Sequence, residues 1–140
     1  MTREERDLVI KDLCGRLPYG VKVRILVHKD DPSSEETLVF NGFDGSSEYV
    51  FWAHDEEKLA KYGCRGRGYH VSEVKPYLRP MSYMTEAERK EYRQLIFRTG
   101  FADYHVTSCD IIDWLNKKMF DFRHLIPKGF ARVAPEGMYS

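Results

Sequence analysis

Hydrophobic residues near the start of the chain recur at the spacing of an amphipathic helix. They stand three or four positions apart, at Val9, Ile10, Leu13 and Leu17. This spacing predicts a helix over residues 1–18, because side chains three and four positions apart share one helix face. Thr2 and Glu5 stand in the spacing of a capping box, in which each side chain satisfies a backbone N–H of the first turn. The stretch LPYG then ends the predicted helix.

The spacing changes to two in the next stretch, which predicts β structure. Apolar residues occupy alternate positions there: Val21, Val23, Ile25 and Val27. Such alternation is typical of a strand with one buried face. Further strands are expected around residues 36–43, in EYVFWA, in YHV and in VKPYL, with a hairpin turn at Asp44-Gly45 or at Asn41-Gly42. The charged stretch HDEEKLAKYG is expected to form one helical turn. Together these segments predict a small, bent antiparallel sheet of the SH3-like barrel type over residues 20–80.

Residues 84–140 predict a helical subregion. Thr85 and Glu88 repeat the capping-box spacing, and Gly100 marks the expected end of this helix. The next expected helix starts at Thr107 or Ser108, with its packing face at Ile111, Ile112, Leu115 and Met119. The last stretch, FDFRHLIPKGFARVAPEGMYS, is too apolar for a free tail and is expected to pack back. We therefore interpret residues 1–140 as one α+β domain.

The composition narrows the expected partners. The charges balance, with 22 Lys and Arg residues against 22 Asp and Glu residues, so no overall field attracts nucleic acid or an anionic membrane. The three cysteines, Cys14, Cys64 and Cys109, form no Cys-x-x-Cys pair, which argues against a disulfide framework or a four-cysteine zinc site. No apolar run approaches the length of about 18 residues that a membrane span needs, and the charged start does not fit a signal peptide. We expect a cytoplasmic protein without a cofactor or membrane contact.

Three stretches are together similar to a known group of proteins: DLCGRLPYGVKV, VKPYLRPMSYMTEAE and DIIDWLNKKMFDFRHLIPKGFARVAPEGMY. In these stretches the chain resembles a family of small uncharacterised proteins encoded by gut Bacteroides and by their phages and mobile elements. The resemblance covers both ends and the middle, whereas residues 28–70 diverge. Because the family has no assigned activity, the resemblance implies no site residue. It implies a cytoplasmic bacterial or phage accessory protein, with interference in host processes as an expected role.

The stretch GCRGRGYH is the first candidate for ligand binding. Its glycines let a ligand approach the backbone, Arg65 and Arg67 suit bidentate contacts to phosphate, and Tyr69 suits stacking on a base. Trp52, in EYVFWA, is a second aromatic residue for the same ligand, a nucleotide or nucleic-acid-like anion. The alternative is a solvated loop whose arginines neutralise the nearby HDEE, with Trp52 in the core. Arg79 is interpreted instead as a structural partner of a carboxylate or a carbonyl.

The stretch WLNKKMFDFRHLI is the candidate for a protein contact. Its aromatic residues fall on more than one helix face, so Trp114 or Phe122 is expected to remain for a partner or a second subunit once the core is filled. The alternative is that both pack within the chain, because a domain of this size has little other core.

Chemical catalysis is only weakly indicated. Cys109 is placed in the first turn of a helix, where the dipole lowers a thiol pKa, but the adjacent Asp110 acts the opposite way. Cys14 is interpreted as a small core residue. No spacing matches a metal site. We therefore predict a non-enzymatic binding protein for a nucleotide or nucleic-acid-like anion. A protein–protein adaptor or inhibitor is the alternative, and an enzyme of unknown type is third.

Overall fold

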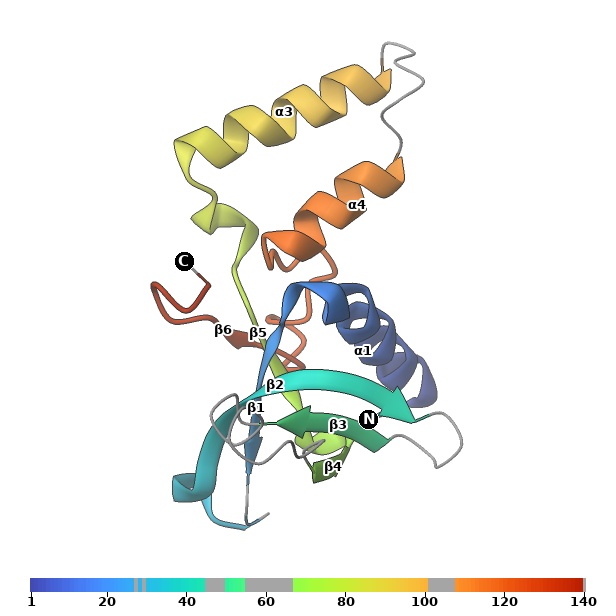
Figure 1. The fold of residues 1–140 in the computed structure, drawn as a ribbon, viewed down its shortest axis with the longest axis vertical. Helices are drawn as coiled ribbons and strands as arrows, with labels where there is room; N and C mark the ends of the chain where they lie inside the picture. Colours follow the sequence, from blue (N-terminus) through green and yellow to red (C-terminus); the bar gives the residue numbers. More distant parts are fainter. Residues whose placement is uncertain (27, 29, 45–49, 55–66, 101–107, 140) are drawn as a thin grey trace.

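The structure is a computed structural model that describes residues 1–26, 28, 30–44, 50–54, 67–100 and 108–139. It is an α+β fold with a helix at the N-terminus, an open mixed sheet and further helices toward the C-terminus (Figure 1). Of the predicted helical turn in HDEEKLAKYG, the first residue, His54, belongs to a strand, and residues 55–63 lie outside the described residues. No helix within the described ranges is long and apolar enough to cross a bilayer.

Helix α1 (Arg3–Arg16) begins at the predicted capping box. The Thr2 hydroxyl accepts from the Glu5 N–H at 3.1 Å, and the Glu5 carboxylate accepts from the Thr2 N–H at 2.6 Å. Val9 and Leu13 of the predicted stripe are fully buried. Leu17, however, lies in a following 3-10 turn and is exposed, so the expectation that it packs with the stripe is wrong.

The sheet has the strand order β4-β3-β2-β1-β5-β6. The strands are β1 (Lys22–Leu26), β2 (Glu35–Asp44), β3 (Val50–His54), β4 (Arg67–His70), β5 (Lys75–Leu78) and β6 (Arg132–Val133). The first five pair antiparallel in this order, whereas β6 pairs parallel with β5. A closed SH3-like barrel is therefore not observed. The edge of β5 that barrel closure would need is occupied by β6 rather than by β4.

The pairing of β2 with β3 excludes one of the two candidate hairpin turns. Asn41 and Gly42 lie inside β2, where the pairing shifts between Phe40 and Gly42 in the manner of a β-bulge. Gly42 has a φ of 146°, a backbone angle that residues with a Cβ rarely adopt. Asn41-Gly42 is therefore not the turn. The strand ends at Asp44, and Gly45 lies outside the described residues.

The main core lies between α1 and the sheet. Its buried apolar residues come from the helix, from the inward face of β1 and β2, and from the 3-10 turn before β5: Val9, Leu13, Val21, Val23, Ile25, Leu38, Phe40, Val71 and Val74. Met119 joins this core from beyond the C-terminal end of α4. The alternation predicted for β1 is confirmed, because Val23 and Ile25 are fully buried and the positions on either side of each are only partly buried.

Helices α3 (Glu86–Gly100) and α4 (Ser108–Lys117) stand side by side, away from the sheet (Figure 1). The predicted capping box of α3 is confirmed, since Glu88 N–H donates to the Thr85 hydroxyl and Thr85 N–H donates to the Glu88 carboxylate. On α4, Leu115 is buried, but Ile112 is 40% exposed and does not belong to the packing face.

The C-terminal stretch packs back on the fold, as the sequence predicts. Leu125 and Ala131 are buried against Leu78 of β5. The Asp121 carboxylate accepts from the N–H groups of Leu125 and Ile126 at 2.8 and 2.9 Å, which fixes the turn between them.

Candidate functional site

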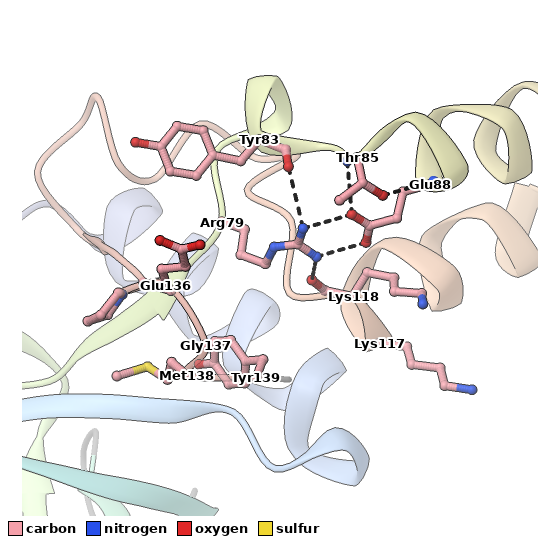
Figure 2. A pocket seen from close by; sticks show the side chains of 12 residues that line it. Arg79, Tyr83, Thr85, Glu88, Lys117, Lys118, Glu136, Gly137, Met138 and Tyr139 are labelled. Carbon is pink, nitrogen blue, oxygen red and sulfur yellow. Dashed lines mark hydrogen bonds and ion pairs between the residues drawn. The ribbon is translucent and has the colours of Figure 1, made fainter.

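Arg79 occupies the junction between the sheet and the helical pair. It follows β5, and its backbone bonds in both directions to the segment after α4, through the Met119 carbonyl at 2.7 Å and the Asp121 N–H at 2.9 Å. Its guanidinium donates to both Glu88 carboxylate oxygens at 2.8 Å and to the Lys118 carbonyl at 3.2 Å (Figure 2). The interpretation of Arg79 as a partner of a carboxylate and a carbonyl is confirmed.

The surroundings of Glu88 keep this pair ionised. The hydrogen bonds from Arg79 lower the pKa of Glu88 to about 2; burial opposes the shift, and the Thr85 N–H adds to it. The same bonds raise the pKa of Arg79. The guanidinium also lies over the Phe120 ring, 4.3 Å from its centroid, which is cation–π geometry. The pair therefore forms a rigid, charge-neutral wall rather than a free cation.

Beside this pair lies a cavity of about 740 Å³. Three parts of the chain line it: the residues between β5 and the start of α3, the C-terminal end of α4, and the segment 134–139. Arg79 and Glu88 form the wall between the first two parts (Figure 2). A cavity of this size falls in the range of about 300 to 1,000 Å³ that small-molecule sites occupy.

The two ends of the cavity differ in charge. Lys117 and Lys118 extend toward one end, whereas Tyr83 and Glu136 lie at the other (Figure 2). Neither lysine ammonium forms an ion pair within the part of the chain that the structure describes. Tyr83 is 58% exposed, so its ring faces solvent at the cavity. The arrangement suits an elongated ligand with one anionic end.

The wall formed by residues 134–139 is tied to the sheet. Tyr139 is its anchor, because its hydroxyl accepts from the Lys22 N–H at 3.0 Å and donates to the Tyr77 carbonyl at 2.7 Å. Burial is the main reason why the pKa of Tyr139 rises to about 12. The Ala134 N–H also donates to the Leu78 carbonyl at 2.8 Å. The cavity thus has preformed walls on the sheet side.

Most of the predicted arginine and tryptophan site lies outside the described residues. Arg65 is outside the described residues, as are the side chains of Arg67 and Trp52. The backbones of β3 and β4 place Trp52 opposite Gly68 and Tyr69 opposite Phe51, which are register positions of opposite faces. Tyr69 packs against the main core. The strand β4 is at the far edge of the sheet from β5, and Tyr69, whose side chain is described, is not among the residues that line the cavity.

The two aromatic residues predicted to bind a partner both have intramolecular contacts. The Trp114 ring stacks on Tyr92 and on Phe120, with centroids 5.6 and 5.8 Å apart, and its Nε1 donates to Glu91 at 2.9 Å. Phe122 contacts the guanidinium groups of Arg16 and Arg123, which lie 5.5 and 4.7 Å from its ring centroid. A further contact of Trp114 or Phe122 with a partner stays a prediction.

One of the two described cysteines does not lie where the sequence predicts. Cys14 is exposed on α1, so its assignment to the core is wrong. The helix turns it away from the buried face that carries Val9 and Leu13. Cys109 lies in the first turn of α4, as predicted, and Cys64 is outside the described residues. Over the described ranges, no three His, Cys, Asp or Glu side chains are grouped as a metal site.

The cavity residues carried little signal in the sequence. Lys117 and Lys118 stand at the C-terminal end of a helix, where cations are common because they complement the helix dipole. Tyr83 and Glu136 are residue types that are common on protein surfaces, and α3 and α4 separate them in the sequence. Of the lining residues, the sequence points to Arg79, Thr85 and Glu88, each for a structural role. Comparison with protein-family models, with curated proteins and with solved structures found no match.

Proposed function

We propose that this protein is a non-enzymatic binding protein whose ligand is a small anion held in the cavity beside Arg79. One observation carries the proposal: two adjacent lysines without an ion-pair partner among the described residues line a preformed cavity of about 740 Å³. A lysine ammonium acts as a mobile point charge that suits phosphate or carboxylate groups. Arg79 does not supply this charge, because both carboxylate oxygens of Glu88 already engage it.

The experiment is a thermal-shift screen of the purified protein against phosphorylated and carboxylated small molecules. A ligand at 100 times its dissociation constant stabilises a fold by about 2.7 kcal/mol. We expect a shift that weakens with salt and disappears in the double variant Lys117→Gln, Lys118→Gln. Lys128→Gln is the matched control, since Lys128 is exposed and lines a different cavity with Glu4 and Leu8.

The same screen separates the cavity from the site predicted in the sequence. If binding is lost in the double variant Arg65→Ala, Arg67→Ala and kept in the double lysine variant, the ligand binds at GCRGRGYH and the cavity proposal is refuted. If no anion shifts the transition, the small-ligand proposal is refuted for both sites.

A protein–protein adaptor or inhibitor is the second candidate function, and the exposed apolar residues of the helical pair favour it. Ile96 and Phe97 on α3 are 47% and 62% exposed, and Ile112 on α4 is 40% exposed. Exposed apolar side chains are common at protein contacts. The test is whether a co-purifying protein is lost from Ile96→Ser, Phe97→Ser and kept by the double lysine variant.

The biological setting proposed for either activity is the one that the sequence resemblance implies. In it, this chain is a bacterial or phage accessory protein that acts in the cytoplasm on a host process. Anion binding would then sequester or sense a host metabolite, whereas protein binding would inhibit a host factor. Fractionation of cells that express the tagged protein tests the location, and a pelleted, membrane-bound protein would contradict it.

A further inference from the structure

The chemical asymmetry of the cavity narrows the class of ligand. Resting on the function proposed above, we infer that the ligand is a nucleoside diphosphate that lies along the cavity, with its phosphates at Lys117 and Lys118 and its nucleoside at Tyr83 and Glu136. The proposal names which end of the ligand meets which residues, so each end is tested separately.

The lysine end fits a diphosphate. Lys117 ends α4, Lys118 follows it, and both line the cavity, with their side chains drawn on the side away from Tyr83 and Glu136 (Figure 2). Their two charges match two phosphate groups, and neither ammonium is engaged by an acid in the described part of the chain. The neighbouring Arg79 and Glu88 neutralise each other at 2.8 Å and leave the local charge to the lysines.

The opposite end does not fit a second anionic group. Glu136 is an exposed carboxylate that lines the cavity there, and it would repel phosphate or carboxylate. This carboxylate can accept a hydrogen bond from a neutral donor. Ribose hydroxyls are such donors, and acidic side chains bind them in nucleotide sites of other folds. At this end the ligand therefore carries a sugar rather than another charge.

Tyr83 supplies the surface for the base. Its backbone is fixed, because its N–H donates to the Pro80 carbonyl at 2.9 Å and its carbonyl accepts from Arg79 at 3.5 Å. Its side chain is 58% exposed at the cavity and is free to cover a planar ring. Stacking of this kind tolerates any base, because every base has a π face. The cavity thus selects a nucleotide without selecting its base.

The test is calorimetric titration with ADP, 2′-deoxy-ADP and inorganic pyrophosphate. We expect ADP to bind about tenfold more tightly than pyrophosphate, because only ADP stacks on Tyr83. We expect the 2′-deoxy compound to bind about fivefold more weakly than ADP, because it lacks one donor to Glu136. Tyr83→Ala should remove the advantage over pyrophosphate. Glu136→Ala should remove the preference for ribose.

The controls separate this inference from the proposed function. Tyr83 and Glu136 are exposed, so both variants should keep the wild-type unfolding midpoint, and Tyr83→Phe should keep ADP binding. If pyrophosphate binds as tightly as ADP and Lys117→Gln, Lys118→Gln abolishes both, the nucleoside assignment is overturned while the anion site stands. If none of the three compounds binds, the assignment of a nucleoside diphosphate is overturned. The proposed function is refuted as well only if no anion of the wider screen binds.

Discussion

The ion pair between Arg79 and Glu88 makes a measurable contribution to the stability of the fold. The two side chains are only 23% and 11% exposed, so water screens their interaction weakly. The pKa of Glu88 falls from 4.5 to about 2 in the folded chain. Because one pKa unit corresponds to about 1.4 kcal/mol, the folded state gains about 3 kcal/mol from the ionised carboxylate at neutral pH.

The perturbation is Glu88→Gln, which keeps the shape of the side chain and removes its charge. We expect the free energy of unfolding at pH 7 to fall by about 2 to 3 kcal/mol, since the amide keeps part of the hydrogen bonding. The folded pKa is depressed, so the stabilisation is present above the unfolded pKa of 4.5 and is lost as pH falls toward about 2. The difference between wild type and variant should therefore shrink over this range.

Urea unfolding at several pH values measures both effects. Glu86→Gln is the matched control on the same helix, because the Glu86 side chain is 83% exposed and its contact with Arg89 is 3.8 Å. Its stability should stay within about 0.5 kcal/mol of wild type. A double-mutant cycle with Arg79→Met isolates the pair. A Glu88→Gln variant as stable as wild type at pH 7, or a difference that does not depend on pH, would refute the reasoning.

Two further predictions concern the residues that hold the cavity walls. Thr85→Ala removes the acceptor of the Glu88 N–H and should lower stability by about 1 kcal/mol in urea unfolding; an unchanged midpoint would contradict the role of the cap. Tyr139→Phe leaves the Lys22 N–H and the Tyr77 carbonyl without their partner and should cost about 1 to 3 kcal/mol. Because the pKa of Tyr139 is raised to about 12, wild type should lose stability as pH rises from 10 to 12, and a Tyr139→Phe variant with the same alkaline loss would exclude this hydroxyl as its source.

Local features of the fold could be predicted because their causes are local. Both capping boxes need only two residues three positions apart, and the alternation of β1 needs only one buried face. The structural role of Arg79 could be predicted from its neighbours in the sequence. In contrast, Cys14 and Ile112 were misplaced because each stands within one helical turn of a buried residue, and the exact face depends on what the helix packs against.

The open sheet and the cavity could not be predicted because they depend on distant segments. β6 has two exposed residues, Arg132 and Val133, and no hydrophobic pattern of its own. It becomes a strand only because β5 offers an edge. The cavity likewise joins Tyr83, Lys118 and Glu136, which no spacing relates. The arginine stretch has a clearer pattern than any of these, but its first four residues lie outside the described residues.

The pairing of β5 with segments from the end of the chain has a consequence for synthesis and folding. β5 pairs with β1 early in the sequence, whereas its other edge is covered by segments from the end of the chain: β6, the bridge between Arg79 and Phe120, and the Tyr139 hydroxyl. While the ribosome is still making residues 120–134, that edge carries unpaired backbone groups, which is the condition that promotes strand-to-strand aggregation. A nascent chain stalled there would thus expose an unpaired strand edge that is covered in the completed fold.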